Sequence, residues 1–141
     1  MLDTETSLLL DYKQFICDNV SYVKANNILP SNPQKLADFV TIVFREANNT
    51  DYNMGKTTNY QEYIDNLLYQ VDIYAKDLVL DGQVVPARMI IIELRTLTSK
   101  FFRELGFIRN SDIKNDYLER NVYKRTMTFS GKKNSWNNEI I

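Results

Sequence analysis

The fold is decided by two neighbouring stretches, LLYQVDIYAKD at residues 67–77 and PARMIIIELRTLTSKFFREL at residues 86–105. Apolar and polar residues alternate along the first stretch. This period of two predicts a strand with one face in the core and the other face wet or shared. The core side carries Tyr69, Val71, Ile73 and Ala75. The second stretch has apolar residues at three- and four-residue steps, which is typical of an amphipathic helix.

Local signals mark the ends of this helix. Pro86 suits the first turn of a helix, and Gly106 stands where a C-terminal cap is expected. Asp81-Gly82, between the strand and the helix, predicts a turn. We therefore expect the helix to occupy residues 86–105, a rod of about 30 Å.

Working outward, the sequence predicts a first helix at residues 8–26, because apolar residues again recur with helical spacing until Asn26 and Pro30 end the pattern. Two further strands are predicted at residues 39–46, FVTIVFRE, and at residues 122–130. In the last strand Tyr123, Met127 and Phe129 share one side. The polar stretch at residues 110–121 is expected to be a loop.

These elements predict one α+β domain over residues 1–131. Its small, mostly antiparallel β-sheet is packed on one face by the two amphipathic helices. A chain of 141 residues has the usual length of one domain. Residues 47–66 lack periodicity and are expected to form a long loop. Residues 132–141 are expected to form a polar C-terminal tail.

The composition excludes most active-site chemistry. The chain has no histidine and one cysteine, Cys17. Triads, dyads and zinc sites that need imidazole or several thiolates are therefore excluded, and so is a disulfide within the chain. Cys17 lies near the apolar stripe of the first helix and is interpreted as a core residue rather than a nucleophile. We expect no catalytic residue, no metal and no cofactor.

Charge is distributed unevenly along the chain. Residues 1–100 hold nine basic and thirteen acidic groups, and residues 101–141 hold eight and five, for a net charge of −1. This asymmetry favours head-to-tail contacts with another chain but falls far short of the basic surplus of a nucleic-acid-binding protein. No apolar run approaches a membrane span, so we expect no membrane contact.

Two local patterns leave an enzymatic alternative open. Gly55-Lys56-Thr57 resembles the end of a phosphate-binding loop but lacks its first glycine, because position 50 is Thr50. A small nucleotide-binding enzyme would need Lys56 to approach Asp81. Separately, Asp112, Asp116 and Glu119 fall in one short span, but their spacing matches no calcium loop, and a solvated loop is the expected reading.

The order of elements resembles the tail-terminator, or tail-completion, proteins of long-tailed phages. In that family a YQVDVYA-type strand precedes an amphipathic helix, a glycine-phenylalanine step closes the helix, and a final strand carrying an arginine follows. Here these features are residues 69–77, residues 86–105, Gly106-Phe107 and residues 123–129. The resemblance covers residues 8–131.

The resemblance implies a structural virion protein without catalysis or cofactor. Such subunits close into a hexameric ring at the head-proximal end of the tail tube, stop its polymerisation and offer a surface for head joining. The implied partners are other copies, the tail tube protein and a head-completion or connector protein, with DNA only passing through the ring. Assembly would occur in the host cytoplasm.

Two departures from the family are the long insertion before residues 69–77 and the extended tail. They leave open a neighbouring head–tail adaptor ring, and a monomeric adaptor inside a cellular complex is a further alternative. We expect the aromatic loop, the acidic body and the basic C-terminal end to contact neighbouring chains. The candidate interface residues are Tyr52, Lys56, Tyr60, Tyr63, Asp72, Asp77, Lys124, Arg125, Lys132, Lys133 and Trp136.

Overall fold

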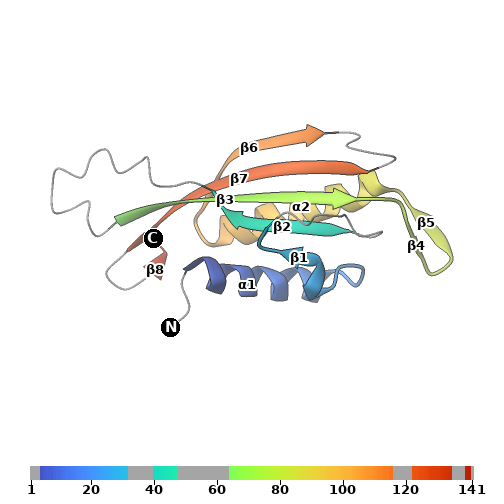
Figure 1. Cartoon of the computed structure of the whole chain (residues 1–141), viewed down its shortest axis with the longest axis horizontal. Helices are drawn as coiled ribbons and strands as arrows, with labels where there is room; N and C mark the ends of the chain where they lie inside the picture. Colours follow the sequence, from blue (N-terminus) through green and yellow to red (C-terminus); the bar gives the residue numbers. More distant parts are fainter. Residues whose placement is uncertain (1–3, 32–39, 48–63, 116–121, 135–138, 141) are drawn as a thin grey trace.

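The centre of the molecule is a mixed, mostly antiparallel sheet with the strand order β1-β2-β3-β7-β6 (Figure 1). The computed structural model describes residues 4–31, 40–47, 64–115, 122–134 and 139–140. Only β1 and β2 pair in parallel, and the short β8 pairs with the end of β7. The strands are β1 (Ile28–Leu29), β2 (Thr41–Glu46), β3 (Ile64–Ala75), β6 (Ile108–Asn115), β7 (Tyr123–Asn134) and β8 (Glu139–Ile140).

Two helices pack on one face of this sheet, as the sequence predicts. Helix α1 (Thr4–Asn19) lies beside β2, and α2 (Ala87–Glu104) lies across β3 and β7 (Figure 1). A short 3-10 turn, η1 (Ala25–Asn27), leads into β1. The predicted α+β class, with both helices on the same face of the sheet, is confirmed.

An aromatic cluster forms the core between the helices and the sheet. Phe102 of α2 stacks on Phe129 of β7 with 4.2 Å between ring centroids, and it also stacks on Phe44 of β2 at 5.7 Å. Tyr12 of α1 also contacts Phe44, with 4.9 Å between ring centroids. Tyr69 of β3 lies 5.5 Å from Phe44 between ring centroids, so three strands and both helices converge on a few rings. Such burial is the main favourable contribution to folding.

The two faces of the sheet differ in chemistry, and we call the helix-covered one the inner face and the opposite one the outer face. Along β3 the inner side chains are apolar and almost fully buried, whereas Gln70, Asp72 and Tyr74 lie on the outer face. The inner side chains are Leu67, Tyr69, Val71, Ile73 and Ala75. The predicted alternation along this strand is confirmed.

The strand β3 is flanked by features that the sequence locates only in part. It begins at Ile64, so residues 64–66 of the expected loop at 47–66 belong to a strand. Between β3 and α2, the predicted Asp81-Gly82 turn is present, and both residues have positive φ angles of 51° and 79°. This turn closes a two-stranded hairpin, β4 (Leu78–Leu80) and β5 (Gln83–Val85), which projects from one end of the sheet (Figure 1).

The first helix ends earlier than predicted. It stops at Asn19 rather than near residue 26, and Val20 makes a last backbone hydrogen bond to Ile16. The Asn19 side chain donates to the Phe15 carbonyl at 2.7 Å, and such local bonds compete with continued helix. Val23 nevertheless stays buried, because the chain turns back onto the core.

The loop predicted at residues 110–121 is wrong for its first half. Residues 108–115 form β6, which pairs antiparallel with β7. Their polar composition misled the prediction, because β6 lies at the end of the strand order, where one edge and much of its surface need no apolar partner. The partner strand β7 also runs beyond the predicted end, to Asn134.

Two glycines allow the close packing where α2 meets β6. Gly106 has a φ angle of 86°, and its N–H and that of Phe107 donate to the carbonyls of Arg103 and Phe102. This is the Schellman pattern of helix termination. The Phe107 ring then lies on Gly131, where a Cβ would come within 2.8 Å of it. The predicted C-cap at Gly106 is confirmed.

Candidate functional site

The most unusual group on the outer face is the Asp72 carboxylate. Asp72 is only 1% exposed, and it accepts hydrogen bonds from Thr126 at 2.7 Å and from the Gln70 amide at 3.2 Å. These donors satisfy a buried charge that would otherwise be costly. Asp72 is thus already engaged within the chain and does not present a surface charge to a neighbouring copy in this structure.

The basic residues of β7 divide between the two faces. The Lys124 ammonium lies over the Tyr74 ring on the outer face, 5.3 Å from its centroid. Arg125 instead points to the inner face, because it alternates with Lys124, and it is bound to Asp112. The sequence predicts Lys124 and Arg125 as one basic contact group, but their side chains lie on opposite faces of the sheet.

A second cluster of charged groups surrounds Asp112, where β6, β7 and α2 meet. Its two carboxylate oxygens accept from Arg125 and Arg95, each at 2.5 Å, and Arg109 lies 3.4 Å away. Burial alone would raise the pKa of Asp112, but the bonds from Arg125 and Arg95 outweigh it and hold the pKa below its ordinary value. The carboxylate therefore stays ionised and ties the edge of the sheet to α2.

A β-bulge brings this cluster together. The pairing of β6 with β7 shifts between Arg109 and Ser111, so that Arg109 pairs with Phe129 and Asp112 pairs with Met127. Both partners lie on the inner face. One extra residue in the strand thus places Arg109 and Asp112 on the same face, three positions apart.

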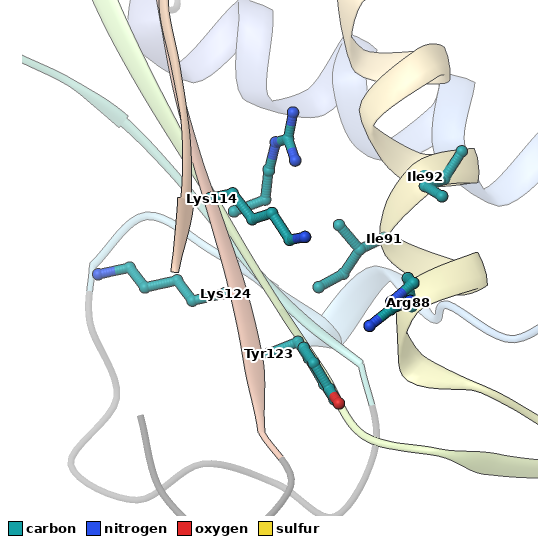
Figure 2. A pocket seen from close by; sticks show the side chains of 7 residues that line it. Arg88, Ile91, Ile92, Lys114, Tyr123 and Lys124 are labelled. Atoms are coloured by element: carbon teal, nitrogen blue, oxygen red, sulfur yellow. The ribbon is translucent and has the colours of Figure 1, made fainter. Parts of the chain in front are cut away.

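A cavity of about 110 Å³ lies next to this cluster, between the start of α2 and the ends of β6 and β7. Figure 2 shows Arg88 reaching into it from α2 and Lys114 reaching toward Ile91 from β6. Tyr123 lies at its lower end, while the Lys124 ammonium points away from the helix. Cationic and apolar side chains together line the cavity.

Several surface positions carry large exposed apolar side chains. On β6, the last strand in the described order, Ile108 is 69% exposed and Ile113 is 52% exposed. On the projecting hairpin, Val79 and Val84 are direct cross-strand partners, and both are about two-thirds exposed. An edge strand with exposed apolar side chains is a template for pairing with another chain.

Two tyrosine hydroxyls tie α2 to the N-terminal part of the chain. Tyr12 is fully buried and shares a hydrogen bond of 2.8 Å with Thr98, while Tyr22 donates to Glu93. Burial raises the pKa of both phenols, and for Tyr22 the Glu93 carboxylate raises the pKa further. Both phenols stay protonated and act as structural donors.

The remaining predicted contact residues are placed only in part. Asp77 is exposed, and its carboxylate accepts the N–H of Ala87 at 2.7 Å, which caps the start of α2. The backbones of Lys132 and Lys133 belong to β7. The predictions that lie outside the described residues are those for Tyr52, Lys56, Tyr60, Tyr63 and Trp136, and with them the proposed approach of Lys56 to Asp81.

Metal-ligand clusters and membrane-spanning helices are absent from the part of the chain that the structure describes. Within those residues no three acidic or cysteine side chains converge as metal ligands would, and no helix combines the length and apolarity of a membrane span. Asp112 of the acidic span at 112–119 is paired with arginines, while Asp116 and Glu119 lie outside the described ranges. Cys17 is half-buried, with its thiol 3.6 Å from the Val23 carbonyl.

Comparison with family models and with curated proteins adds no relative. No family model matches the chain, and no curated protein does. The interpretation of function therefore depends on the geometry described above and on the resemblance of the sequence motifs.

Proposed function

We propose that this chain is a structural subunit of a phage tail, a tail terminator whose copies close into a hexameric ring at the head-proximal end of the tail tube. The observation that carries the proposal is the edge strand β6, on which the large apolar side chains of Ile108 and Ile113 are exposed. A ring needs two different patches on each copy, and an edge strand supplies one of them.

The second patch is proposed on the part of the outer face that β3 and β7 form. Both described helices lie on the inner face, which leaves Lys124 and Tyr74 on a helix-free surface. The charge asymmetry between residues 1–100 and 101–141 favours a head-to-tail arrangement of such patches. In this assembly the chain contacts other copies, the tube protein and a head-completion or connector protein, and performs no catalysis.

The test is the mass of the assembly in solution, followed by imaging of its symmetry. We expect particles of six times the 16.6 kDa mass of the chain, alone or with isolated tail tubes, and six-fold rings in electron micrographs. Ile113→Lys adds a charge at the β6 edge and is expected to abolish the ring while the chain stays folded. The matched control, Met89→Lys, adds the same charge at an exposed site on α2 and is expected to leave the ring intact.

A second pair of variants tests the outer face. Lys124→Glu reverses a charge there and is expected to weaken assembly, whereas Lys100→Glu makes the same change at an exposed site on α2. Rings that form undiminished in both Ile113→Lys and Lys124→Glu would contradict this arrangement. A single copy under all conditions, including excess tail tubes, would contradict the function itself.

A further inference from the structure

We propose that two copies of this chain pair edge to edge through β6, in antiparallel orientation, as a symmetric dimer. Ile108 then lies opposite Ile113 of the second copy, and Arg109 lies opposite Asp112 of the second copy. This dimer is the state of the chain away from tail tubes, and it does not rest on the proposed ring. Because it occupies the edge that the ring also uses, it precedes assembly.

The strand β6 offers an edge at which a second strand can add. It pairs with β7 on one side and comes last in the described strand order β1-β2-β3-β7-β6 (Figure 1). The backbone N–H and C=O groups along the outer side of such a strand are a template for another chain. Ile108 and Ile113 are both more than half exposed on this strand, and a second strand would cover them.

The side chains of β6 complement those of the same strand read in reverse. Ile108 and Ile113 lie on the outer face, and Arg109 and Asp112 lie on the inner face, as their partners on β7 show. In an antiparallel pair of two such strands, each isoleucine meets an isoleucine and each arginine meets an aspartate. Apolar pairs and opposite-charge pairs directly across a strand pair are both favourable. The two-fold axis repeats each pair.

The β-bulge of β6 makes this register possible. In a regular strand, residues 108 and 113 are an odd number of positions apart and would point to opposite faces. The extra residue, Asn110, brings both onto the outer face. Directly opposite residues of an antiparallel pair share a face, so the bulge is what allows Ile108 to meet Ile113 of a second copy. The same holds for Arg109 and Asp112.

Arg109 is the arginine best placed to reach across the edge. Its side chain is 41% exposed, and its 3.4 Å contact with Asp112 is longer than the contacts of Arg95 and Arg125. It can therefore turn to Asp112 of the second copy, while the two shorter contacts hold that carboxylate in place. A carboxylate accepts hydrogen bonds from several donors at once, so the added guanidinium displaces none of them.

The helix layer leaves room for this pairing. Helix α2 packs mainly over β3 and β7, away from the outer side of β6. Neighbouring strands of a sheet are about 4.8 Å apart, so the β7 strands of the two copies would be about 14 Å apart. Packed helices need only about 8–10 Å between their axes. The two α2 helices therefore do not collide. A single pair of short strands buries little area, so we expect a weak and reversible dimer.

Cysteine cross-linking tests the register. The full chain carries Cys17→Ala, which removes its own thiol. One chain with Ile108→Cys and another with Ile113→Cys are mixed and mildly oxidised. We expect a covalent dimer of the two, because opposite positions in a strand pair have the Cα distance of a disulfide. Each chain oxidised alone is the matched control, since two copies of the same position lie about 17 Å apart in this register.

Sedimentation without tail tubes, over a range of concentrations, measures the association. We expect a reversible equilibrium between one copy and two, ending at twice the 16.6 kDa mass of the chain. Arg109→Glu places a like charge opposite Asp112 and is expected to weaken the dimer by about tenfold or more. Lys100→Glu makes the same change on the exposed side of α2 and is expected to leave the dimer unchanged. Thermal unfolding verifies that each variant folds.

Three results would overturn the dimer. They are a chain without a two-copy species at any concentration, cross-linking of the mixed chains no greater than that of either chain alone, and a dimer that Arg109→Glu leaves unchanged. Rings formed on tail tubes by a chain that never dimerises would leave the proposed function standing. Dimers that never form rings on tail tubes would contradict the proposed function and leave the β6 pairing standing.

Discussion

The two faces of one sheet are built on opposite principles. On the inner face, apolar rings from three strands pack against two helices, and Phe102 contacts Phe129 and Phe44 directly. On the outer face, the same strands carry threonines, a glutamine and the buried Asp72, joined by hydrogen bonds. The inner face stabilises the fold by burying apolar surface away from water. The outer face stabilises it by hydrogen bonds between its polar side chains.

This difference between the faces indicates where a substitution costs much stability and where it costs little. An aromatic core has no substitute for a lost ring, because the neighbours relax only partly into the cavity that remains. A polar network depends on each partner, but its half-buried rim can be altered at little cost. The variants below test this contrast, from the largest expected effect to the smallest.

Phe102→Ala should produce the largest loss. It removes the ring that stacks on Phe129 at 4.2 Å, and we expect the free energy of unfolding in urea to fall by about 3 to 5 kcal/mol. The matched outer-face variant, Thr128→Ala, removes a half-buried side chain bonded to Ser111 and should cost about 1 kcal/mol. Similar losses in both variants would refute the contrast between the faces.

Asp112→Asn should rank next, because it breaks the ion pairs that hold β6 to α2. Its arginine partners are 18% and 31% exposed, so the loss at pH 7 should be about 1 to 3 kcal/mol, below that of a fully buried pair. The control is Asp81→Asn in the exposed hairpin turn, which should change stability by less than about 0.5 kcal/mol.

The same pair of variants gives a dependence on pH with a definite sign. The pKa of Asp112 is lowered in the folded chain, so its contribution is complete above the ordinary value of 3.8 and is lost as pH falls through the folded pKa. The stability difference between the parent chain and Asp112→Asn should therefore shrink below pH 3.8. A difference that stays constant down to pH 2 would contradict the ionised pair.

Asp72→Asn tests the outer network with almost no change of shape. The amide keeps one oxygen for Thr126 but presents an NH₂ group to the Gln70 amide, so we expect a loss of about 1 to 2 kcal/mol in urea unfolding. Asp72→Ala, which removes both acceptors, should cost more than Asp72→Asn. The reverse order would show that the outer face gains nothing from this carboxylate.

Tyr12→Phe should give the smallest effect, about 1 kcal/mol, because the ring contacts with Phe44 remain and only the bond to Thr98 is lost. The double variant Tyr12→Phe with Thr98→Val should recover part of the loss, since it removes both polar partners. Calorimetric melting of the two variants measures this difference. It shows whether the inner face tolerates a polar pair only when the pair is complete.

The inner face was predictable from sequence because its signals are periodic. The alternation at residues 67–77 and the stripe at residues 86–105 each repeat one pattern often enough to identify the element and its buried side. Gly106 was predictable as well, since a positive φ angle favours glycine. The fold class followed from these few segments.

The charged surfaces were not predictable in the same way. Asp72 sits at a position that alternation assigns to the wet side of β3, and only its neighbours on β7 reveal that it is buried. Strand β6 was missed because an edge strand needs little apolar content, and the early end of α1 coincides with a side-chain bond of Asn19 that helical spacing does not predict. The cluster around Asp112 needs three elements brought together by tertiary packing, and no spacing in the sequence encodes that.

The bulge in β6 makes the position of a whole charge cluster depend on one residue that stays out of the pairing. If Asn110 were paired with Thr128 in a regular ladder, the strand beyond it would run in the opposite phase, and Asp112 and Lys114 would exchange faces with Ile113. The ion pairs to α2 and the cationic side of the cavity would disappear together, and an isoleucine would enter the core side in their place. A shift of the pairing by one residue would thus move this charge from one surface to the other, whereas deletion of Asn110 would remove only the bulge and leave Asp112 opposite Met127.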